Sequence, residues 1–430
     1  MNRIKETFVL GFAIFASFFG AGNLILPPMI GFNAGPDWWL VSIGFLSSTT
    51  VIPLLALLGF ARLQGSIMDF SQKVSSKFSL IFSIGIYGIA VILACPRTAA
   101  VTHEMAIQPY FETDSLLTSS IYFSLVFVFV INRGKVMEVL GKYLSPIIGI
   151  IILTIIGIGL FAPSEMMLEG KYNSPYINGF LEGYQTYDAL AGLIMGGVMV
   201  ITLKNSKNYV TDRDKKIMIA RSSFIAMMGL LIIYVGMIFL GAKYNAVFDA
   251  SMSRPQLLSG LASETLGSLG NAFLSVLVAL ACFTTAVSVI VGTADFFKDL
   301  FNNSKKAYVI TAAISVIIGI IMGQFEVKFI IDLAVYVLMF LYPMSIALIF
   351  LNLFPEKYGS QAVFRIVVGI AFVFSIPDFL KFLIPPENLE FIYNTIPFSR
   401  EGMGWVLPSI IGFLTVNAVK WKQDTKAKES

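Results

Sequence analysis

The first apolar segment of the chain contains its own interruption. Residues 8–31 are long enough to cross a lipid bilayer as a helix, yet the middle of the segment is Gly20–Asn23, and Pro27–Pro28 follows. Glycine weakens a helix interior by about 1 kcal/mol and proline by about 3 kcal/mol. An unpaired backbone group is costly in lipid, so such a break persists only where protein or a polar cavity covers it. The break is therefore a candidate binding site for an ion or a polar solute.

The rest of the chain has the composition of a membrane protein. Of its 430 residues, 57% are hydrophobic and 13% are charged, whereas a soluble domain carries about 25% charged residues. We expect a single all-α polytopic domain over 1–430 with twelve transmembrane helices, in contact with membrane lipid and without a soluble domain. Residues 1–7 are too short for a cleavable signal, so the first helix stays. The expected spans are 8–31, 38–61, 79–108, 117–132, 143–162, 180–203, 217–242, 269–295, 307–324, 329–353, 362–384 and 402–420.

The basic residues predict the orientation of these spans. Twelve spans place both termini on one side of the membrane, and 23 of the Lys and Arg residues fall on that side against 6 on the other. Cytoplasmic segments carry such an excess, so we expect both termini to be cytoplasmic. The net charge of +4 reflects this asymmetry, and we expect no nucleic-acid partner.

A second irregular segment, 179–192, opens the sixth span. Polar residues and glycines again interrupt an apolar helix, and paired interruptions in two halves of a chain point to the binding site of an inverted-repeat transporter. Gln185 and Thr186 supply polar groups there, and Tyr187 supplies an aromatic wall. Asp188 could accept a substrate ammonium group, bind a cation or carry a proton. The alternative is that Asp188 caps the helix at a wet boundary.

The first break offers both side-chain and backbone ligands. The N–H groups of Ala21, Gly22 and Asn23, after Gly20, begin a second half-helix whose positive end suits a carboxylate. The Asn23 amide could bind a cation or a substrate carboxylate, and it could also cap the half-helix.

The eighth span carries a polar face. Ala281, Thr284 and Thr285 stand at i, i+3 and i+4, so they share one side of a helix. Hydroxyl and carbonyl oxygens are ligands that hard cations prefer. The alternative is that both hydroxyls donate to carbonyls one turn earlier in the same helix.

The remaining polar residues exclude several classes of function. Arg97 either faces the cavity, where it could pair with Asp188, or extends to the outer interface. His103, the single histidine, is expected at the outer surface. Cys95 and Cys282 are expected as small buried residues, so no disulfide framework or histidine metal cluster is expected. The sequence lacks the motifs of hydrolases and P-loops, which argues against an enzyme and against an ATPase subunit.

Three motifs together resemble one transporter family. They are residues 18–28 in the first span, 95–100 (Cys-Pro-Arg-Thr-Ala-Ala) in the third and 183–191 in the sixth. These motifs are similar to those of the bacterial leucine/isoleucine/valine:cation symporter family, of the amino acid–polyamine–organocation group. The resemblance implies a leucine-transporter-like fold of two inverted five-helix repeats, with helices 1 and 6 broken. The repeats would span 1–162 and 180–353, followed by two additional helices over 362–420.

The resemblance also implies an activity. Members of this family import leucine, isoleucine and valine across the bacterial cytoplasmic membrane, coupled to a cation. In sodium-coupled members of the wider fold, one Na⁺ lies between the broken first helix and the eighth. Carried over to this chain, the Na⁺ ligands are Ala16, Phe19, Ala281, Thr284 and Thr285. A proton-coupled symporter of the same fold is the alternative, and a channel is a more remote one.

Overall fold

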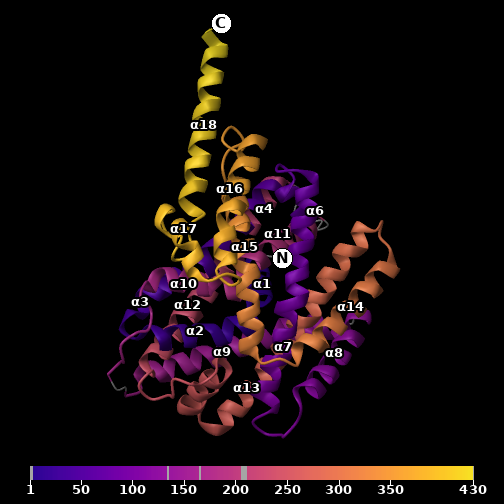
Figure 1. Cartoon of the computed structure of the whole chain (residues 1–430). Coiled ribbons are helices and arrows are strands. Elements are labelled where there is room, and N and C mark those ends of the chain that lie inside the picture. Colours follow the sequence, from indigo (N-terminus) through magenta and orange to yellow (C-terminus); the bar gives the residue numbers. More distant parts are fainter. Residues whose placement is uncertain (1–2, 133–134, 164–165, 205–210, 430) are drawn as a thin grey trace. The chain divides into compact units, whose positions relative to one another are not determined.

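The chain is helical throughout the part that the structure describes. The computed structural model covers residues 3–132, 135–163, 166–204 and 211–429 in enough detail to describe, and all regular secondary structure there is helical (Figure 1). Within these ranges, seven helices are long and apolar enough to cross a membrane, or eight if the bent pair Pro175–Thr186 and Asp188–Lys204 counts as one span. Ser115–Ile131 and Pro146–Phe161 are shorter apolar helices. The all-helical class is confirmed, and the number of twelve crossings stays a prediction.

The helices form two compact units that alternate along the sequence. The first unit contains Met1–Ser47, Tyr87–Thr186 and Ile225–Ala334, and the second contains Ser48–Ile86, Tyr187–Phe224 and Val335–Ser430. Three of the boundaries fall inside the helices α6, α12 and α15, and one falls in the second predicted break. Each unit therefore combines segments from both halves of the chain.

The first unit holds the first break and the helices around it. Its elements are α1 (Arg3–Phe18), α2 (Ala21–Ala34), η1 (Gly35–Asp37), α3 (Trp38–Leu46), the end of α6, η3 (Ala90–Ala94), α7 (Cys95–Thr102), η4 (His103–Ile107), α8 (Ser115–Ile131), α9 (Lys135–Phe161), α10 (Pro175–Glu182), η5 (Gly183–Thr186), the second part of α12 (Asp212–Lys243), α13 (Arg254–Leu300), α14 (Lys305–Gly323) and the start of α15 (Val327–Leu353).

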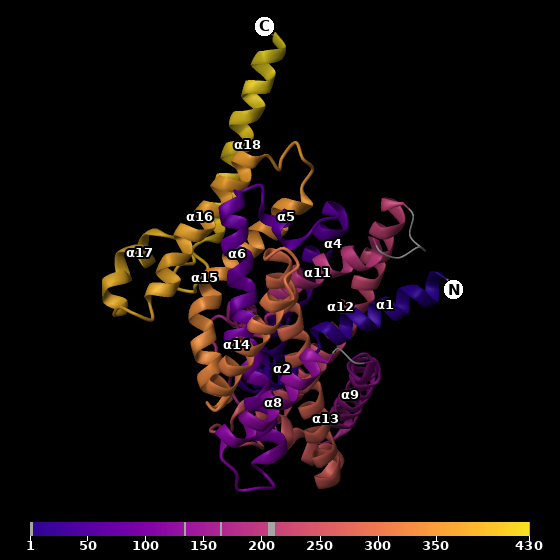
Figure 2. The same cartoon turned by 90° about the vertical axis from the view of Figure 1, so that its right-hand side faces the viewer.

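Small residues allow the helices of the first unit to approach closely. A side chain on Gly31 of α2 would overlap the Ile238 carbonyl of α12, and one on Gly241 of α12 would overlap the Pro28 carbonyl. Helices with small residues at their contact pack backbone to backbone. Elsewhere in the unit α8 and α14 lie side by side (Figures 1 and 2), around the buried Phe123.

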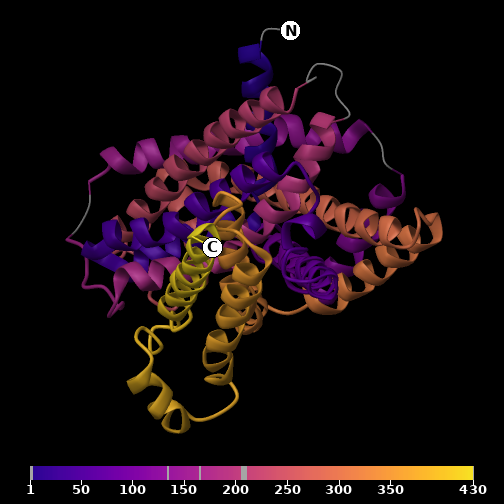
Figure 3. The same cartoon turned by 90° about the horizontal axis from the view of Figure 1, so that it is seen from above.

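The second unit takes up the chain again at Tyr187, within the second break. Its elements are η2 (Ser47–Val51), α4 (Ile52–Leu63), α5 (Ile67–Ser71), most of α6 (Ser76–Ile89), α11 (Asp188–Lys204), the first part of α12, most of α15, α16 (Gln361–Leu380), η6 (Pro386–Leu389), α17 (Glu390–Thr395) and α18 (Val406–Glu429). Within this unit α16 and α18 lie side by side, joined through the segment that carries α17 (Figure 3).

Candidate functional site

The first break lies at Phe19 and Gly20. Helix α1 ends at Phe18, Gly20 is extended (φ −108°, ψ −175°), and α2 begins at Ala21. The Gly20 N–H donates to the Phe18 carbonyl at 2.9 Å, whereas in a continuous helix it would donate to the carbonyl of Ala16. The Ala16 carbonyl therefore loses its helical donor, and the Phe19 carbonyl lies beyond the end of α1. These two carbonyls are among the Na⁺ ligands that the family resemblance implies.

The other side of the break presents donors. Ala21, Gly22 and Asn23 form the first turn of α2, and the first N–H groups of a helix have no partner within it. Gly20 is the N-cap residue and provides no side-chain cap. The alternative that Asn23 caps this helix is wrong, because Asn23 already lies inside the first turn.

Asn23 instead connects the break to another helix. Its side-chain amide donates to the hydroxyl of Tyr234 in α12. Its Oδ1 atom lies 3.9 Å from the position that a Cβ atom would take on Gly20. The nitrogen of the amide is thus directed to α12, and its oxygen faces the break.

Thr284 and Thr285, on one face of α13, lie near the first break. Thr285 Oγ1 lies 3.5 Å from the Cβ position of Gly20. The hydroxyls of Thr284 and Thr285 both donate to the Ala281 carbonyl at 2.9 Å, which is the back-bonding geometry of the alternative interpretation. A hydroxyl that donates its proton keeps lone pairs that can bind a cation, so this hydrogen bonding is compatible with an ion ligand.

Arg97 lies between the two breaks. Its side chain is 5% exposed, and Nη1 donates to the Gln185 carbonyl at 2.6 Å. The guanidinium group also packs against Gly22, where a side chain would collide with it. Arg97 therefore faces inward, and the alternative that it extends to the outer interface is wrong.

The second break is a short turn rather than a gap. Helix α10 is followed by the 3₁₀ turn η5, and the following helix α11 is bent by 47° from α10–η5. Tyr187, between η5 and α11, has a left-handed φ of 64°, which is strained for a bulky side chain. The Thr186 hydroxyl donates to the Gly183 carbonyl at 2.8 Å. The helical path is therefore interrupted within the predicted segment 179–192, and its rank as the sixth span stays a prediction.

The predicted site residues divide between the two units. Gly20–Asn23, Ala281–Thr285, Gln185 and Thr186 all belong to the first unit, where Arg97 connects the two breaks. Tyr187 and Asp188 begin the second unit, and they are 7% and 1% exposed. Asp188 is the first residue of α11 and is buried.

Sequence reasoning missed three residues of this region. Arg254, at the start of α13, donates from Nη1 to Gln185 Oε1 at 2.6 Å and pairs with Glu182 at 3.2 Å. Tyr234 is the third, as the partner of Asn23. Arg254 follows a long loop, so no helical periodicity could have connected it to Glu182. Burial and the nearby Glu182 charge raise the pKa of Tyr172 above its usual value, so its hydroxyl stays neutral beside this pair.

His103, Cys95 and Cys282 are all buried. His103 is 8% exposed, with Nδ1 at 2.9 Å from the Thr118 hydroxyl. The prediction of a surface histidine is wrong, because the ring packs against α8. Cys95 and Cys282 are buried and unbridged, as expected. Within the described ranges, no three His, Cys, Asp or Glu side chains gather as metal ligands would.

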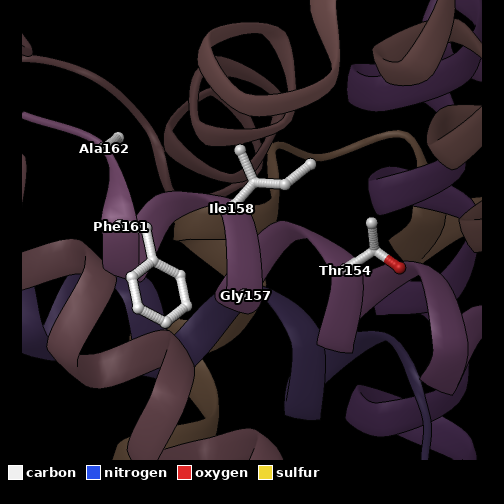
Figure 4. A pocket seen from close by; sticks show the side chains of 5 residues that line it. All are labelled: Thr154, Gly157, Ile158, Phe161 and Ala162. Atoms are coloured by element: carbon white, nitrogen blue, oxygen red, sulfur yellow. The ribbon is translucent and has the colours of Figure 1, made fainter.

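One surface pocket lies apart from the breaks. It is lined by Thr154, Gly157, Ile158, Phe161 and Ala162, at the end of α9 (Figure 4). Three of the five, Ile158, Phe161 and Ala162, contribute apolar side chains, and Gly157 has no side chain. None belongs to the predicted site, and we assign the pocket no part in binding.

Solved structures identify the class of fold. The chain matches the inward-facing conformation of Mhp1 with a TM-score of 0.62 at 14% identity, over 97% of this chain and 91% of that one. It matches MhsT in complex with L-phenylalanine with a TM-score of 0.59 at 15% identity, over 86% and 98%. These likenesses and the two interrupted helices define the class of fold, an all-helical leucine-transporter-like fold.

Sequence relatives identify the family. The model of the branched-chain amino acid transport protein family matches residues 3–423, and the chain belongs to this family. It is 32% identical to the branched-chain amino acid transport system 2 carrier protein of Pseudomonas aeruginosa, over 96% of each chain. It is 31% identical to the branched-chain amino acid permease BraB of Bacillus subtilis, over 95% of this chain and 94% of that one. These relatives are transporters and not enzymes.

Proposed function

We propose that this protein imports leucine, isoleucine and valine together with Na⁺, as a secondary active transporter that works by alternating access. Membership of the branched-chain family supports the substrate class. The excess of basic residues on one side supports cytoplasmic termini in a bacterial cytoplasmic membrane. The observation that carries the coupling proposal is the position of Thr285 beside Gly20, because it brings a hydroxyl to the one place where α1 loses its helical hydrogen bonding.

The ion would bind on the carbonyl side of the first break. The ligands would be the Ala16 and Phe19 carbonyls with oxygens of Ala281, Thr284 and Thr285. All five are neutral oxygen donors, the type that hard cations accept. Both hydroxyls can keep their hydrogen bond to Ala281 while they bind the ion through lone pairs.

The amino acid would bind on the amide side of the same break. The N–H groups of Ala21, Gly22 and Asn23 start a helix and suit the substrate carboxylate. Gln185, Thr186, Tyr187 and Asp188 would complete the site from the second break, with Asp188 as the acceptor of the substrate ammonium group. An ion and a carboxylate on opposite sides of one break attract each other, which gives each a higher affinity when the other is bound.

Uptake into proteoliposomes tests the proposal. Radiolabelled leucine would be supplied under an imposed Na⁺ gradient or an imposed proton gradient, with unlabelled amino acids as competitors. We expect saturable uptake driven by Na⁺, with isoleucine and valine as effective competitors. Uptake driven by the proton gradient alone would establish the proton-coupled alternative, and flux that does not saturate would establish a channel.

Variants of the threonine face test the ion site. Thr285→Ala removes the hydroxyl beside Gly20, and we expect the half-saturating Na⁺ concentration to rise by about tenfold or more, the equivalent of about 1.4 kcal/mol. Thr284→Ala should act in the same direction. Thr285→Ser keeps the hydroxyl and is the matched control. If both alanine variants kept the Na⁺ dependence of the parent, the proposed ion site would be wrong.

A further inference from the structure

The start of α13 is an arm that is separated from the rest of its helix. Residues 254–266, which we call the arm, precede Gly267, where φ is +73° and the helix is interrupted. A side chain on Gly267 would meet nothing within 4 Å, so packing does not fix this hinge. The arm begins with a capping box in which Ser253 and Gln256 bond reciprocally, so it is a helix with its own start.

The apolar side of the arm is docked. Leu257, Leu258, Leu261 and Ala262 are all 0% exposed, whereas Ser263 and Glu264 on the other side are exposed. Such burial stabilises the docked position. Its helix is continuous up to Gly267, so the arm would move as one unit about this residue.

A polar triangle attaches the arm to the second break. Arg254 donates to Gln185 Oε1 at 2.6 Å and lies 3.2 Å from Glu182 Oε2. Gln185 Nε2 in turn donates to the same Glu182 oxygen at 2.9 Å. Each of the three side chains thus contacts the other two, and Arg254 is the only one supplied by the arm.

Gln185 makes contacts in two directions. Its side chain contacts Arg254, and its main-chain carbonyl accepts the hydrogen bond from Arg97. Arg97 packs against Gly22 in the first break. The position of the arm is therefore connected through one residue to the backbone of η5 and to the first break.

The ion pair is suited to repeated opening. The side chains of Arg254 and Glu182 are 21% and 23% exposed, and partly exposed ion pairs contribute little net stability. Water can replace each contact when the arm leaves, whereas a fully buried pair would leave an uncompensated charge.

We propose that Arg254 is a positioning residue that latches the arm to the second break. With the latch closed, the apolar side of the arm stays buried. Gln185 is then held so that its carbonyl accepts the hydrogen bond from Arg97. With the latch open, the arm swings about Gly267 and the second break loses this support. The inference rests on the proposed transport function for its role in a cycle, but the latch itself can be measured without transport.

Cysteine labelling measures the latch directly. Ala262→Cys places a thiol on the buried side of the arm, and Ser263→Cys places one on the exposed side. The purified full-length protein in nanodiscs would be treated with a polar maleimide that reaches both membrane sides, in the absence of any amino acid. Labelling of the parent, with its buried Cys95 and Cys282, would be subtracted.

We expect Arg254→Gln to increase the labelling rate at Ala262→Cys by about tenfold, with no change at Ser263→Cys. Arg400→Gln, which removes an exposed arginine bonded to Asn394, is the matched control and should change neither rate. The charge exchange Arg254→Glu with Glu182→Arg should restore slow labelling, which would show that the effect of Arg254→Gln comes from the lost pair with Glu182. Equal labelling rates for the parent and Arg254→Gln would overturn the latch.

The second part of the experiment adds leucine and Na⁺. If the proposed function holds, we expect this addition to slow labelling of Ala262→Cys further in the parent and not in Arg254→Gln. An effect of Arg254→Gln without any effect of leucine and Na⁺ would support the latch and contradict the proposed function. The two failures are therefore distinguishable.

Discussion

The two helix breaks differ in which parts of the polypeptide provide their polar groups. At the first break, Gly20 is extended, Gly22 leaves room for Arg97, and most of the polar groups are main-chain carbonyls and amides. At the second break, the chain keeps a 3₁₀ turn, and its side chains are bonded. Thr186 contacts Gly183, and Gln185 contacts Glu182 and Arg254.

This difference assigns different tasks to the two breaks. Main-chain carbonyls and amides do not recognise a particular substrate side chain. A site built from them therefore suits the carboxylate, which all amino acid substrates share, and the coupling ion. Side chains in a bonded turn are held in position by their partners, and a change of partner moves them. The first break is therefore suited to binding the carboxylate and the ion. The second break, besides the ammonium contact proposed for Asp188, is suited to closing and opening around what is bound.

The largest expected effect follows from the glycine that the first break requires. Gly22→Ala places a methyl group in the position of the Arg97 guanidinium, so this group must shift, and the shift disturbs its hydrogen bond to the Gln185 carbonyl. We expect initial leucine uptake to fall by about a hundredfold, or roughly 3 kcal/mol. The measurement is uptake at equal amounts of reconstituted protein, with size-exclusion chromatography to show folding.

Gly292→Ala is the matched control for this substitution. Gly292 lies in α13, and a methyl group there would meet nothing within 4 Å. Alanine is about 1 kcal/mol better than glycine within a helix, so this variant should transport normally and be at least as stable as the parent. Normal uptake by Gly22→Ala would show that Arg97 does not need its place between the breaks.

Part of this arrangement could be predicted from the sequence. Glycine at Gly20 and Gly22, and the polar run from Gln185 to Asp188, marked both breaks, because each departs from a strongly apolar pattern. The spacing of Ala281, Thr284 and Thr285 marked the polar face of α13, because helical periodicity is local information. Their meeting at Gly20 required the family resemblance, since no local signal brings α2 and α13 together.

Other features depend on contacts between distant segments. From the sequence, the Arg97 side chain could face the cavity or the outer interface. The packing of its guanidinium group against Gly22 decides between the two. Arg254 and Glu182 are 72 residues apart in the sequence, so their pairing has no local signature. The sequence marked Gly20–Asn23 as the first break, and the structure narrows it to Phe19 and Gly20, with Ala21–Asn23 starting α2 as predicted. Pro27 has no N–H, so it cannot make the helical hydrogen bond to the residue one turn earlier.

A smaller effect tests whether a side chain also binds at the first break. Asn23→Ala removes both the amide oxygen that faces the break and the donor to Tyr234. Tyr234→Phe removes only the hydroxyl that accepts this bond. We expect Asn23→Ala to raise the half-saturating concentration of Na⁺ or leucine by about tenfold, and Tyr234→Phe to change it by about twofold or less.

The stability of the two variants separates binding from structure. Each loses the same buried hydrogen bond, so each should lower the free energy of unfolding by about 1 kcal/mol. Thermal unfolding of the detergent-purified proteins gives the comparison. Equal transport defects in Asn23→Ala and Tyr234→Phe would show that Asn23 only positions α2 against α12.

The smallest expected effect is at the second break. Thr186→Val keeps the shape of the side chain and removes the hydroxyl that donates to the Gly183 carbonyl within η5. The turn still has its main-chain path and the contacts of Gln185, so we expect uptake to fall by about two- to threefold, equivalent to roughly 0.5 kcal/mol. Thr186→Ser keeps the donor and should behave as the parent does. A loss as large as that of Gly22→Ala, with Thr186→Ser active, would show that the Thr186 hydroxyl contacts the substrate directly and that its main role is not the hydrogen bond within η5.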